Sequence, residues 1–194
     1  MFLIVGLGHP GLAYTTTRHN IGFQFIDYFC HFSGFPDFKE YLRSQITSKF
    51  VDYNNEKAKV FLQKPQTFMN LSGEAVIQSV SFYKINIDNV LVIHDDIDLA
   101  PFEVRIKKGG SNGGHNGLRS IDSAIGKDYW RIRIGVGRPK DKSQVASYVL
   151  SAFYKDEFEF IHNKLFPKLS EHILEFLFAT DRLLITQNIS QSLK

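Results

Sequence analysis

The sequence predicts a single α/β domain, in which a mixed, largely parallel and twisted sheet is flanked by helices. Short β-prone runs alternate along the chain with segments whose apolar residues recur at helical spacing, which is typical of such domains. The run from Val90 to Ile93 is apolar throughout, as expected for a strand buried on both faces of a parallel sheet. A length of 194 residues suits one domain, which we place at residues 1–186. The polar tail at residues 187–194 is expected to fray.

The first half of the chain predicts a strand, a helix, a hairpin and a second helix. The opening apolar run stops at Gly6, and Asn54-Asn55-Glu56 between two β-prone runs is a hairpin signal. Apolar residues at helical spacing indicate the two helices. In order, we expect a strand at 2–5, a helix at 20–32, strands at 45–53 and 57–63, and a helix at 72–83.

The second half predicts three strands and three helices. Alternating apolar residues indicate the two strands that follow Val90–Ile93. The last and longest helix has acids in its first turn and is interrupted at Pro167. In order, we expect strands at 90–93 and 104–107, a helix at 118–125, a strand at 132–136, and helices at 145–153 and 156–179.

Composition excludes several protein classes. A chain with 43% hydrophobic and 22% charged residues is neither disordered nor fibrous. A single cysteine, Cys30, excludes an intramolecular disulfide framework and a multi-cysteine zinc site. No run reaches the 18 or so apolar residues of a membrane span, and the first residues lack the basic flank of a secretory signal. We therefore expect a soluble, cytoplasmic protein with no membrane partner.

Basic side chains are concentrated in one segment. The chain has a formal net charge of +3, but residues 103–142 hold ten Lys and Arg against four acids. Residues 151–181 show the opposite bias, with three Lys against six acids. The contrast favours a face that binds a polyanion; an ordinary solvated surface is the alternative.

The loop after the first strand combines glycines with a histidine. Gly6-Leu7-Gly8-His9-Pro10-Gly11 has the spacing of a dinucleotide fingerprint. The next helix is delayed to about residue 20, however, and no acid-ended second strand follows at the expected distance, so we expect no nucleotide cofactor. His19 lies at the junction of loop and helix, where a histidine acts as a catalytic base or as a capping or surface residue.

Polar residues also follow two later strands. In the segment Lys64–Gly73, Asn70 is either a helix cap or a side-chain amide that binds substrate. His94-Asp95-Asp96-Ile97-Asp98 ends the most apolar strand, where unpaired charge is costly. Two interpretations of this cluster stay open. The carboxylates bind a metal together with His9, His19 or His115, or one of them orients a catalytic imidazole.

A third segment, Gly109–Gly117, is a glycine-rich loop that contains the pair His115-Asn116. Such a loop before a helix suggests close approach of the backbone to a ligand. A flexible hinge is the alternative.

Taken together, these segments resemble the bacterial-type peptidyl-tRNA hydrolases. The match covers residues 3–153 in order and at the family's spacing. It consists of Gly6-Leu-Gly8-x-Pro-Gly11, Tyr14, Thr17-Arg18-His19-Asn20, Lys64-Pro-x-Thr-Phe-Met-Asn70-x-Ser-Gly73, His94-Asp95-Asp96-x-Asp98-Leu, Gly113-Gly114-His115-Asn116-Gly117, Ile134-Gly135-x-Gly137-Arg138-Pro139 and Tyr148-Val149-Leu150-x-x-Phe153.

The resemblance implies hydrolysis of the ester between a peptide, or an N-blocked amino acid, and the 3′ ribose of peptidyl-tRNA. By this resemblance His19 is the general base that activates water, without a metal or other cofactor, and Asp95 holds its imidazole. The remaining implied roles are substrate binding by Tyr14, Phe68, Asn70 and Asn116, and loop support by Met69, Gly114 and His115. The helix near Tyr148–Phe153 resembles the family's mobile cover. The resemblance also implies a role in tRNA recycling during translation, which we expect a monomer to perform.

One position departs from the family pattern. His9 stands where the family's glycine motif has Asn, a residue that by resemblance helps to distinguish blocked peptidyl-tRNA from free aminoacyl-tRNA. Histidine is bulkier and lacks the paired donor and acceptor of an amide. Discrimination between the two substrates is therefore the property that this sequence puts in question.

The basic segment gains a specific role if the substrate is a tRNA. We expect it to bind phosphates, with Arg105, Lys107, Lys108, Arg131 and Arg133 as the contacts. The competing functions are a metal-dependent hydrolase or nuclease and a non-enzymatic RNA-binding module.

Overall fold

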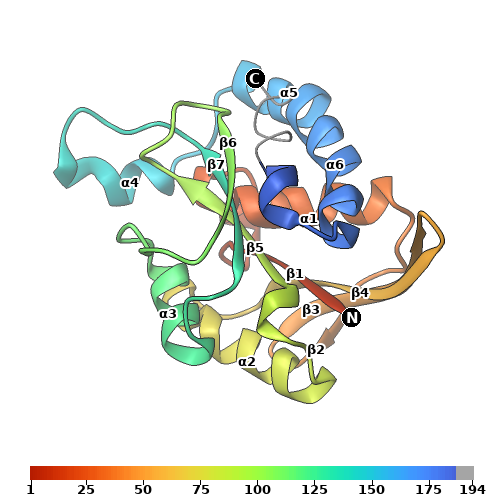
Figure 1. Ribbon diagram of the computed structural model, residues 1–194. Helices are drawn as coiled ribbons and strands as arrows, with labels where there is room; N and C mark the ends of the chain where they lie inside the picture. The colour runs from red at the N-terminus through yellow and green to blue at the C-terminus, as the bar shows by residue number, and fades with distance from the viewer. Residues whose placement is uncertain (187–194) are drawn as a thin grey trace.

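A seven-stranded mixed sheet runs through the middle of the computed structural model, which describes residues 1–186 (Figure 1). The strand order is β2-β3-β4-β1-β5-β7-β6, and β4, β1, β5 and β7 form a parallel centre with antiparallel pairs at both sides. The strands are β1 (Phe2–Gly6), β2 (Lys39–Tyr41), β3 (Ser44–Tyr53), β4 (Glu56–Pro65), β5 (Val90–Asp96), β6 (Val104–Lys108) and β7 (Trp130–Gly135). The predicted fold class is therefore confirmed. The tail at residues 187–194 lies outside the described residues.

Helices cover both faces of the sheet. In Figure 1, α1 and α6 lie on one face and α2 and α3 on the other. The helices are α1 (Ile21–Phe32), α2 (Ser72–Tyr83), α3 (Asn116–Ile125), α4 (Val145–Val149), α5 (Lys155–Phe160) and α6 (Phe166–Phe178). Three short 3₁₀ turns that bear on the site are Leu12–Tyr14, Arg18–Asn20 and Met69–Leu71.

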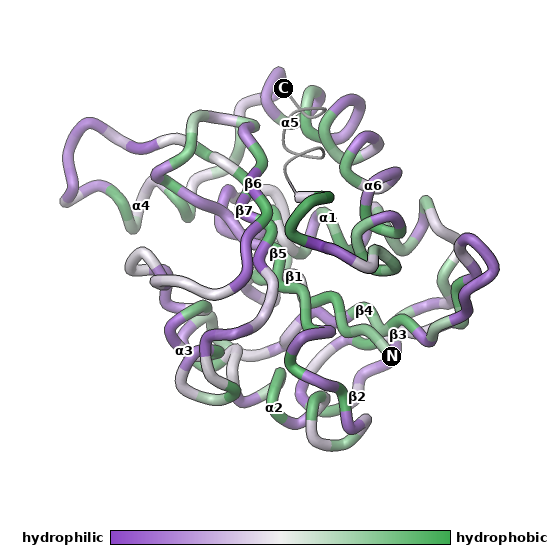
Figure 2. Tube along the Cα trace, in the orientation of Figure 1, coloured by the Kyte–Doolittle hydropathy of each residue, from purple (hydrophilic) through white to green (hydrophobic). Residues whose placement is uncertain are grey.

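The central strands supply apolar side chains to two separate cores. Ile4 and Ile93 face α1 and α6, whereas Leu3 and Val92 face α2 and α3. Figure 2 shows β1 and β5 as mainly hydrophobic. A strand buried on both faces needs apolar residues at every position rather than alternation, which is the pattern that predicted these strands.

The hairpin and the last helix show how local chemistry sets element boundaries. Asn54 and Asn55 have φ of 50° and 66°, the left-handed conformation of a two-residue hairpin turn. The helix expected at 156–179 is divided into α5, a π-helical turn (Ile161–Leu165) and α6. Pro167 has no N–H to donate to the carbonyl oxygen of the residue four positions earlier, and the proline ring would clash with that carbonyl group. The interruption therefore falls in the turn before the proline.

One expectation about a smaller element was wrong, and one strand was not expected at all. The helix predicted at 145–153 ends at Val149, because Ala152 pairs in a β-bridge with Thr17 instead. The strand β2 was not predicted; it has three exposed residues and pairs only at the edge of the sheet.

The first glycine motif serves packing between β1 and α1. A Cβ at Gly6 would lie 2.3 Å from the carbonyl oxygen of Gly22, and one at Gly22 would lie 2.4 Å from the Leu7 nitrogen. Only glycine permits this approach of strand and helix. None of the helices in residues 1–186 is long and apolar enough to cross a membrane.

Candidate active site

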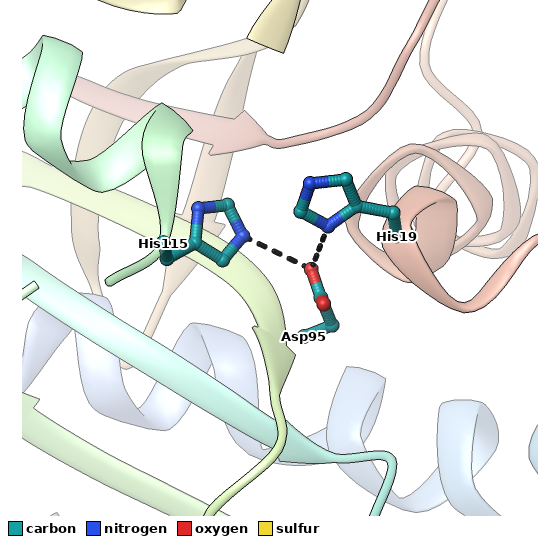
Figure 3. Close-up of side chains that lie close together, drawn as sticks. All are labelled: His19, Asp95 and His115. Atoms are coloured by element: carbon teal, nitrogen blue, oxygen red, sulfur yellow. Dashed lines mark hydrogen bonds and ion pairs between the residues drawn. The ribbon is translucent and has the colours of Figure 1, made fainter. Parts of the chain in front are cut away.

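The carboxyl end of β5 and the start of α1 bring Asp95 and His19 together. The apolar part of β5 ends at Ile93, and Asp95 follows on the same strand with its side chain 2% exposed. His19 lies in the 3₁₀ turn that precedes α1, and α1 follows the strand next to β5. His19 Nδ1 is 2.8 Å from Asp95 Oδ1 (Figure 3). The two residues that the sequence singled out therefore form one pair.

This contact fixes the chemistry of the imidazole. Burial opposes ionisation of Asp95, but its interactions with His19 and His115 outweigh burial and hold the pKa of Asp95 well below its usual range. An ionised carboxylate accepts, so Nδ1 of His19 donates. Figure 3 shows the other ring nitrogen of His19 pointing away from Asp95. In neutral His19 that nitrogen, Nε2, carries the lone pair that a general base needs.

Burial and Asp95 act in opposite directions on His19. Burial lowers the pKa of His19, whereas the charge of Asp95 and its hydrogen bond raise it, and the net effect is a pKa above the ordinary imidazole value. The side chain is 11% exposed, so the base stays accessible from the cavity beside it.

His115 is a second imidazole on the same carboxylate oxygen. Its Nε2 lies 3.0 Å from Asp95 Oδ1, and its ring lies 4.8 Å from that of His19 between centroids. Its Nδ1 accepts hydrogen bonds from the backbone N–H of Gly117 and Leu118, because His115 is the N-cap of α3. Nδ1 is therefore unprotonated, and Nε2 carries the proton that it donates to Asp95.

The same tautomer decides between the two interpretations of the carboxylate cluster. Ligand atoms of His19, Asp95 and His115 lie within 4.8 Å of one another, a spacing that a metal ion could bridge. A metal at His115 would need the Nε2 lone pair, and the imidazole could supply it only by protonating Nδ1 and breaking the helix cap. The donor set thus favours a carboxylate that orients an imidazole.

His94 contacts both Asp95 and His115. It is fully buried, and burial lowers its pKa to about 3, so the ring stays neutral. Its Nδ1 donates to the backbone carbonyl of Asp95, and its ring packs edge-on against that of His115 at 5.1 Å.

A cavity of about 630 Å³ opens beside the pair. His19, Asp95 and Asn116 line it together with residues of α4. A second, smaller cavity of about 390 Å³ is lined by both Asn70 and Asn116. Asn116 therefore stands between the two cavities, which the sequence could not indicate. The sequence also missed the cavity residues Lys142, Val145 and Ala146.

The glycine loop after β1 brings a third imidazole to the site. Asn20 accepts from the backbone nitrogen of His9 and donates to its carbonyl oxygen, at 2.9 Å each, which fixes the loop. The ring of His9 lies 5.5 Å from that of His19 and 5.0 Å from that of Tyr14. Burial, and then the neighbouring His19, lower the pKa of His9.

Phe68, predicted to bind substrate, and Met69, predicted to support the loop, differ in exposure. Phe68 precedes the turn Met69–Leu71 and is 70% exposed, whereas Met69 is buried. A Cβ at Gly117 would come within 2.6 Å of Met69 Sδ, so Met69 contacts the start of α3. It thus lies under the loop that carries Asn116, in a supporting position.

The second glycine loop uses its own amides internally. The N–H of Gly113 donates to Ser111 Oγ and that of Gly114 to Asn112 Oδ1. Gly114 has a φ of 82°, which favours glycine. These two amides are engaged within the loop, so they do not provide the oxyanion support that such loops can offer.

Four of the five predicted phosphate contacts fall into two groups. Lys107 and Arg133 line the cavity, and Arg133 pairs with Asp96 at 2.6 Å. Arg105 pairs with Glu103, and Lys108 with Asp88, both partly exposed. Burial and the charges of Arg133 and Arg131 lower the pKa of Lys107, which places it in a crowded cationic region.

Arg131 corrects the sequence prediction. Its side chain is 0% exposed and forms an ion pair with Asp122 at 2.8 Å. A guanidinium without exposed surface cannot contact a phosphate in this conformation, so Arg131 is removed from the phosphate contacts. The sequence could not separate it from Arg133, because alternation along β7 does not tell which basic residue has a buried partner.

Comparisons with known proteins show which family the chain belongs to. The family model for peptidyl-tRNA hydrolase matches residues 3–192. A peptidyl-tRNA hydrolase of Bartonella henselae is 44% identical over 197 residues, covering 100% of this chain and 97% of the relative. One from Wolbachia pipientis wMel is 52% identical over 153 residues, covering 79% and 82%. A crystal structure of the Acinetobacter baumannii enzyme superimposes with a TM-score of 0.79 at 34% identity, covering 100% of this chain and 92% of that one. The chain belongs to the peptidyl-tRNA hydrolase family.

Proposed function

We propose that this chain hydrolyses the ester between the peptide, or an N-blocked amino acid, and the 3′ ribose of peptidyl-tRNA, releasing free tRNA. The observation that carries the proposal is the His19–Asp95 pair beside a large cavity, in a chain that belongs to this family. An ester of this kind needs an activated water and support for the developing oxyanion. The His19–Asp95 pair supplies the group that activates the water.

His19 is the base in this proposal. Its Nε2 takes a proton from a water molecule while the water oxygen bonds to the ester carbonyl carbon. The tetrahedral intermediate then collapses, the bond from carbon to the ribose O3′ breaks, and the protonated imidazole returns the proton to O3′. The products are a peptide acid and a tRNA with a free 3′ hydroxyl. Asp95 holds Nδ1 and stabilises the imidazolium between the two proton transfers.

We assign substrate binding to Asn70 and Asn116, which line the cavities, and to Tyr14, Phe68 and His9 on nearby loops. The side-chain amides of Asn70 and Asn116 can donate to a carbonyl oxygen and accept from a peptide N–H. Tyr14 and the exposed Phe68 offer rings to the 3′ end of the tRNA or to the peptide. His9 lies next to His19 and is the residue that would contact the acyl group nearest the ester.

Phosphate binding is assigned to the basic residues whose side chains keep some exposed surface. Lys107 and Arg133 open into the cavity, and Arg105 and Lys108 lie on the neighbouring β6. A track of this kind binds the tRNA backbone through charge, without reading its sequence. We further propose that the protein acts as a monomer in the cytoplasm.

Incubation with N-acetyl-aminoacyl-tRNA, with and without a chelator, tests the proposal. The expected result is release of free tRNA and the acetylated amino acid at the same rate in both samples. Loss of cleavage with the chelator would instead identify a metal-dependent hydrolase. RNA binding without any cleavage would leave only an RNA-binding module.

A further inference from the structure

The glycine loop Gly109–Gly117 needs an anchor, because it carries His115 and Asn116 into the site. Four of its glycines have positive φ, namely Gly109, Gly110, Gly113 and Gly114. Glycine loses more conformational freedom on folding than any other residue. The loop therefore holds one shape only where outside contacts fix it.

The buried guanidinium of Arg131 supplies such a contact. Its Nη1 donates to the carbonyl oxygen of Ser111 at 2.9 Å, in the middle of the loop. Its Nη2 donates to Asp122 Oδ1 at 2.8 Å, and its Cζ lies 4.6 Å from the ring centre of Tyr129. One rigid fork thus connects β7, the loop and α3.

Asp122 completes the anchor from the opposite side. Its Oδ1 also accepts from the hydroxyl of Tyr129 at 2.8 Å, and its Oδ2 accepts from the side-chain amide of Asn112 at 3.4 Å. The backbone carbonyl oxygen of Asn112 in turn accepts from the backbone N–H of His115 at 2.9 Å. The carboxylate is therefore hydrogen-bonded to the loop as well as to the arginine.

These contacts form a continuous path to the catalytic pair. Asp122 and Arg131 hold Ser111 and Asn112, Asn112 holds the backbone of His115, and His115 donates to Asp95. We propose that Arg131 and Asp122 are positioning residues, which fix the loop so that His115 and Asn116 reach the site. This inference rests on the proposed function, and it gives Arg131 a role in turnover instead of phosphate binding.

The test needs a variant that keeps the fold. Removing one partner leaves an unpaired charge in the interior, whereas replacing both with apolar residues of similar size is often tolerated. We therefore choose the double variant Arg131→Met with Asp122→Leu, together with the single variant Arg131→Lys. Lysine keeps a cation beside Asp122 but loses the fork that also reaches Ser111. The matched control is Lys57→Met with Asp52→Leu, which removes an exposed pair on the hairpin of β3 and β4.

Four measurements separate positioning from stability and from phosphate binding. We expect the folded double variant to lose about 10²-fold in kcat, the scale of a misplaced catalytic group, with KM and the salt slope of tRNA binding unchanged. Amide exchange of residues 109–117 should become faster. The ¹⁵N spectrum should lose the single Nε2–H tautomer of His115.

Two results would overturn the inference. One is a double variant with wild-type kcat and a protected loop; the other is a reduced salt slope, which would return Arg131 to the phosphate contacts. If the double variant does not fold, the single variant Arg131→Lys tests the inference. Faster amide exchange of the loop together with a lower kcat supports the inference. Wild-type loop exchange and wild-type kcat refute it. Absence of cleavage by the wild-type protein would refute the proposed function alone, because loop exchange and the imidazole spectrum still test the anchor.

Discussion

His19 and Asp95 are 76 positions apart in the sequence, yet Nδ1 and Oδ1 lie 2.8 Å apart between the start of α1 and the end of β5. Parallel strands place their carboxyl ends, and the loops that follow, at one edge of the sheet. Residues from distant motifs therefore converge there. The pair gives a defined direction to proton transfer, since only the nitrogen facing away from Asp95 remains to act as base.

The variant His19→Ala should lose about 10²–10⁴-fold in kcat, the usual contribution of a general base. Affinity for tRNA should be largely retained, because the basic residues around the cavity are unchanged. Steady-state hydrolysis of N-acetyl-aminoacyl-tRNA measures the first quantity and direct tRNA binding the second. His31→Ala, at an exposed position of α1, is the control; near-normal turnover of the His19 variant would remove the residue from its role.

The pH dependence of kcat/KM should follow the titration of His19. Burial lowers its pKa and Asp95 raises it, with a net value above the reference of 6.5. Protonated imidazole cannot take a proton from water, so activity should be high above this raised pKa and fall as the pH drops through it. In Asp95→Asn the raising charge is lost while burial remains, so turnover should fall and the acid limb should shift to lower pH. An unshifted limb would show that another group controls it.

His9 should weaken the distinction between blocked and free substrates. Its lowered pKa keeps the ring neutral at pH 7, and a neutral imidazole accepts a hydrogen bond from an amide N–H or from an ammonium group alike. We expect the wild type to cleave free aminoacyl-tRNA at a measurable rate relative to the N-acetylated form, and His9→Asn to restore preference for the latter. Strong preference in the wild type would contradict this prediction.

Replacing Lys107 with Met should weaken tRNA binding and reduce its salt dependence. Each lost phosphate contact lowers the slope of log affinity against log salt by about 0.7–0.9. Binding titrations at several salt concentrations measure the slope, with Lys57→Met as the control at an exposed hairpin position. An unchanged slope for Lys107→Met would place this residue outside the phosphate track.

Gly22→Ala should destabilise the fold although alanine is the better helix former by about 1 kcal/mol. The added methyl would lie 2.4 Å from both the Leu7 nitrogen and the Ile93 carbonyl oxygen. Overpacking of this kind costs about 1–3 kcal/mol, which lowers Tm by several degrees for a chain of this size. Thermal unfolding measures the effect, and an equal or higher Tm would mean that α1 can move away from β1.

The sequence alone determined the alternation of strands and helices, the two-sided burial of β1 and β5, and the candidates His19, Asp95 and His115. These features depend on local patterns: apolar periodicity, turn residues, and polar groups where a buried strand ends. The last helix shows both the reach and the limit of such patterns: Pro167 predicted the interruption, but apolar periodicity did not indicate the π-helical turn Ile161–Leu165 that forms it.

Only the tertiary structure decided which nitrogen of His115 carries the proton. It alone also decided which of the two arginines of β7, Arg131 or Arg133, is fully buried. The first depends on the cap of α3, and the second on Asp122 lying behind β7 at the right distance for Arg131. The tautomer of His115 and the burial of Arg131 both depend on contacts between segments that are distant in the sequence. Local sequence patterns carry no information about such contacts. Arg131 and Arg133 occupy equivalent positions in the alternating pattern of β7, yet packing leaves the side chain of Arg131 0% exposed and that of Arg133 20% exposed.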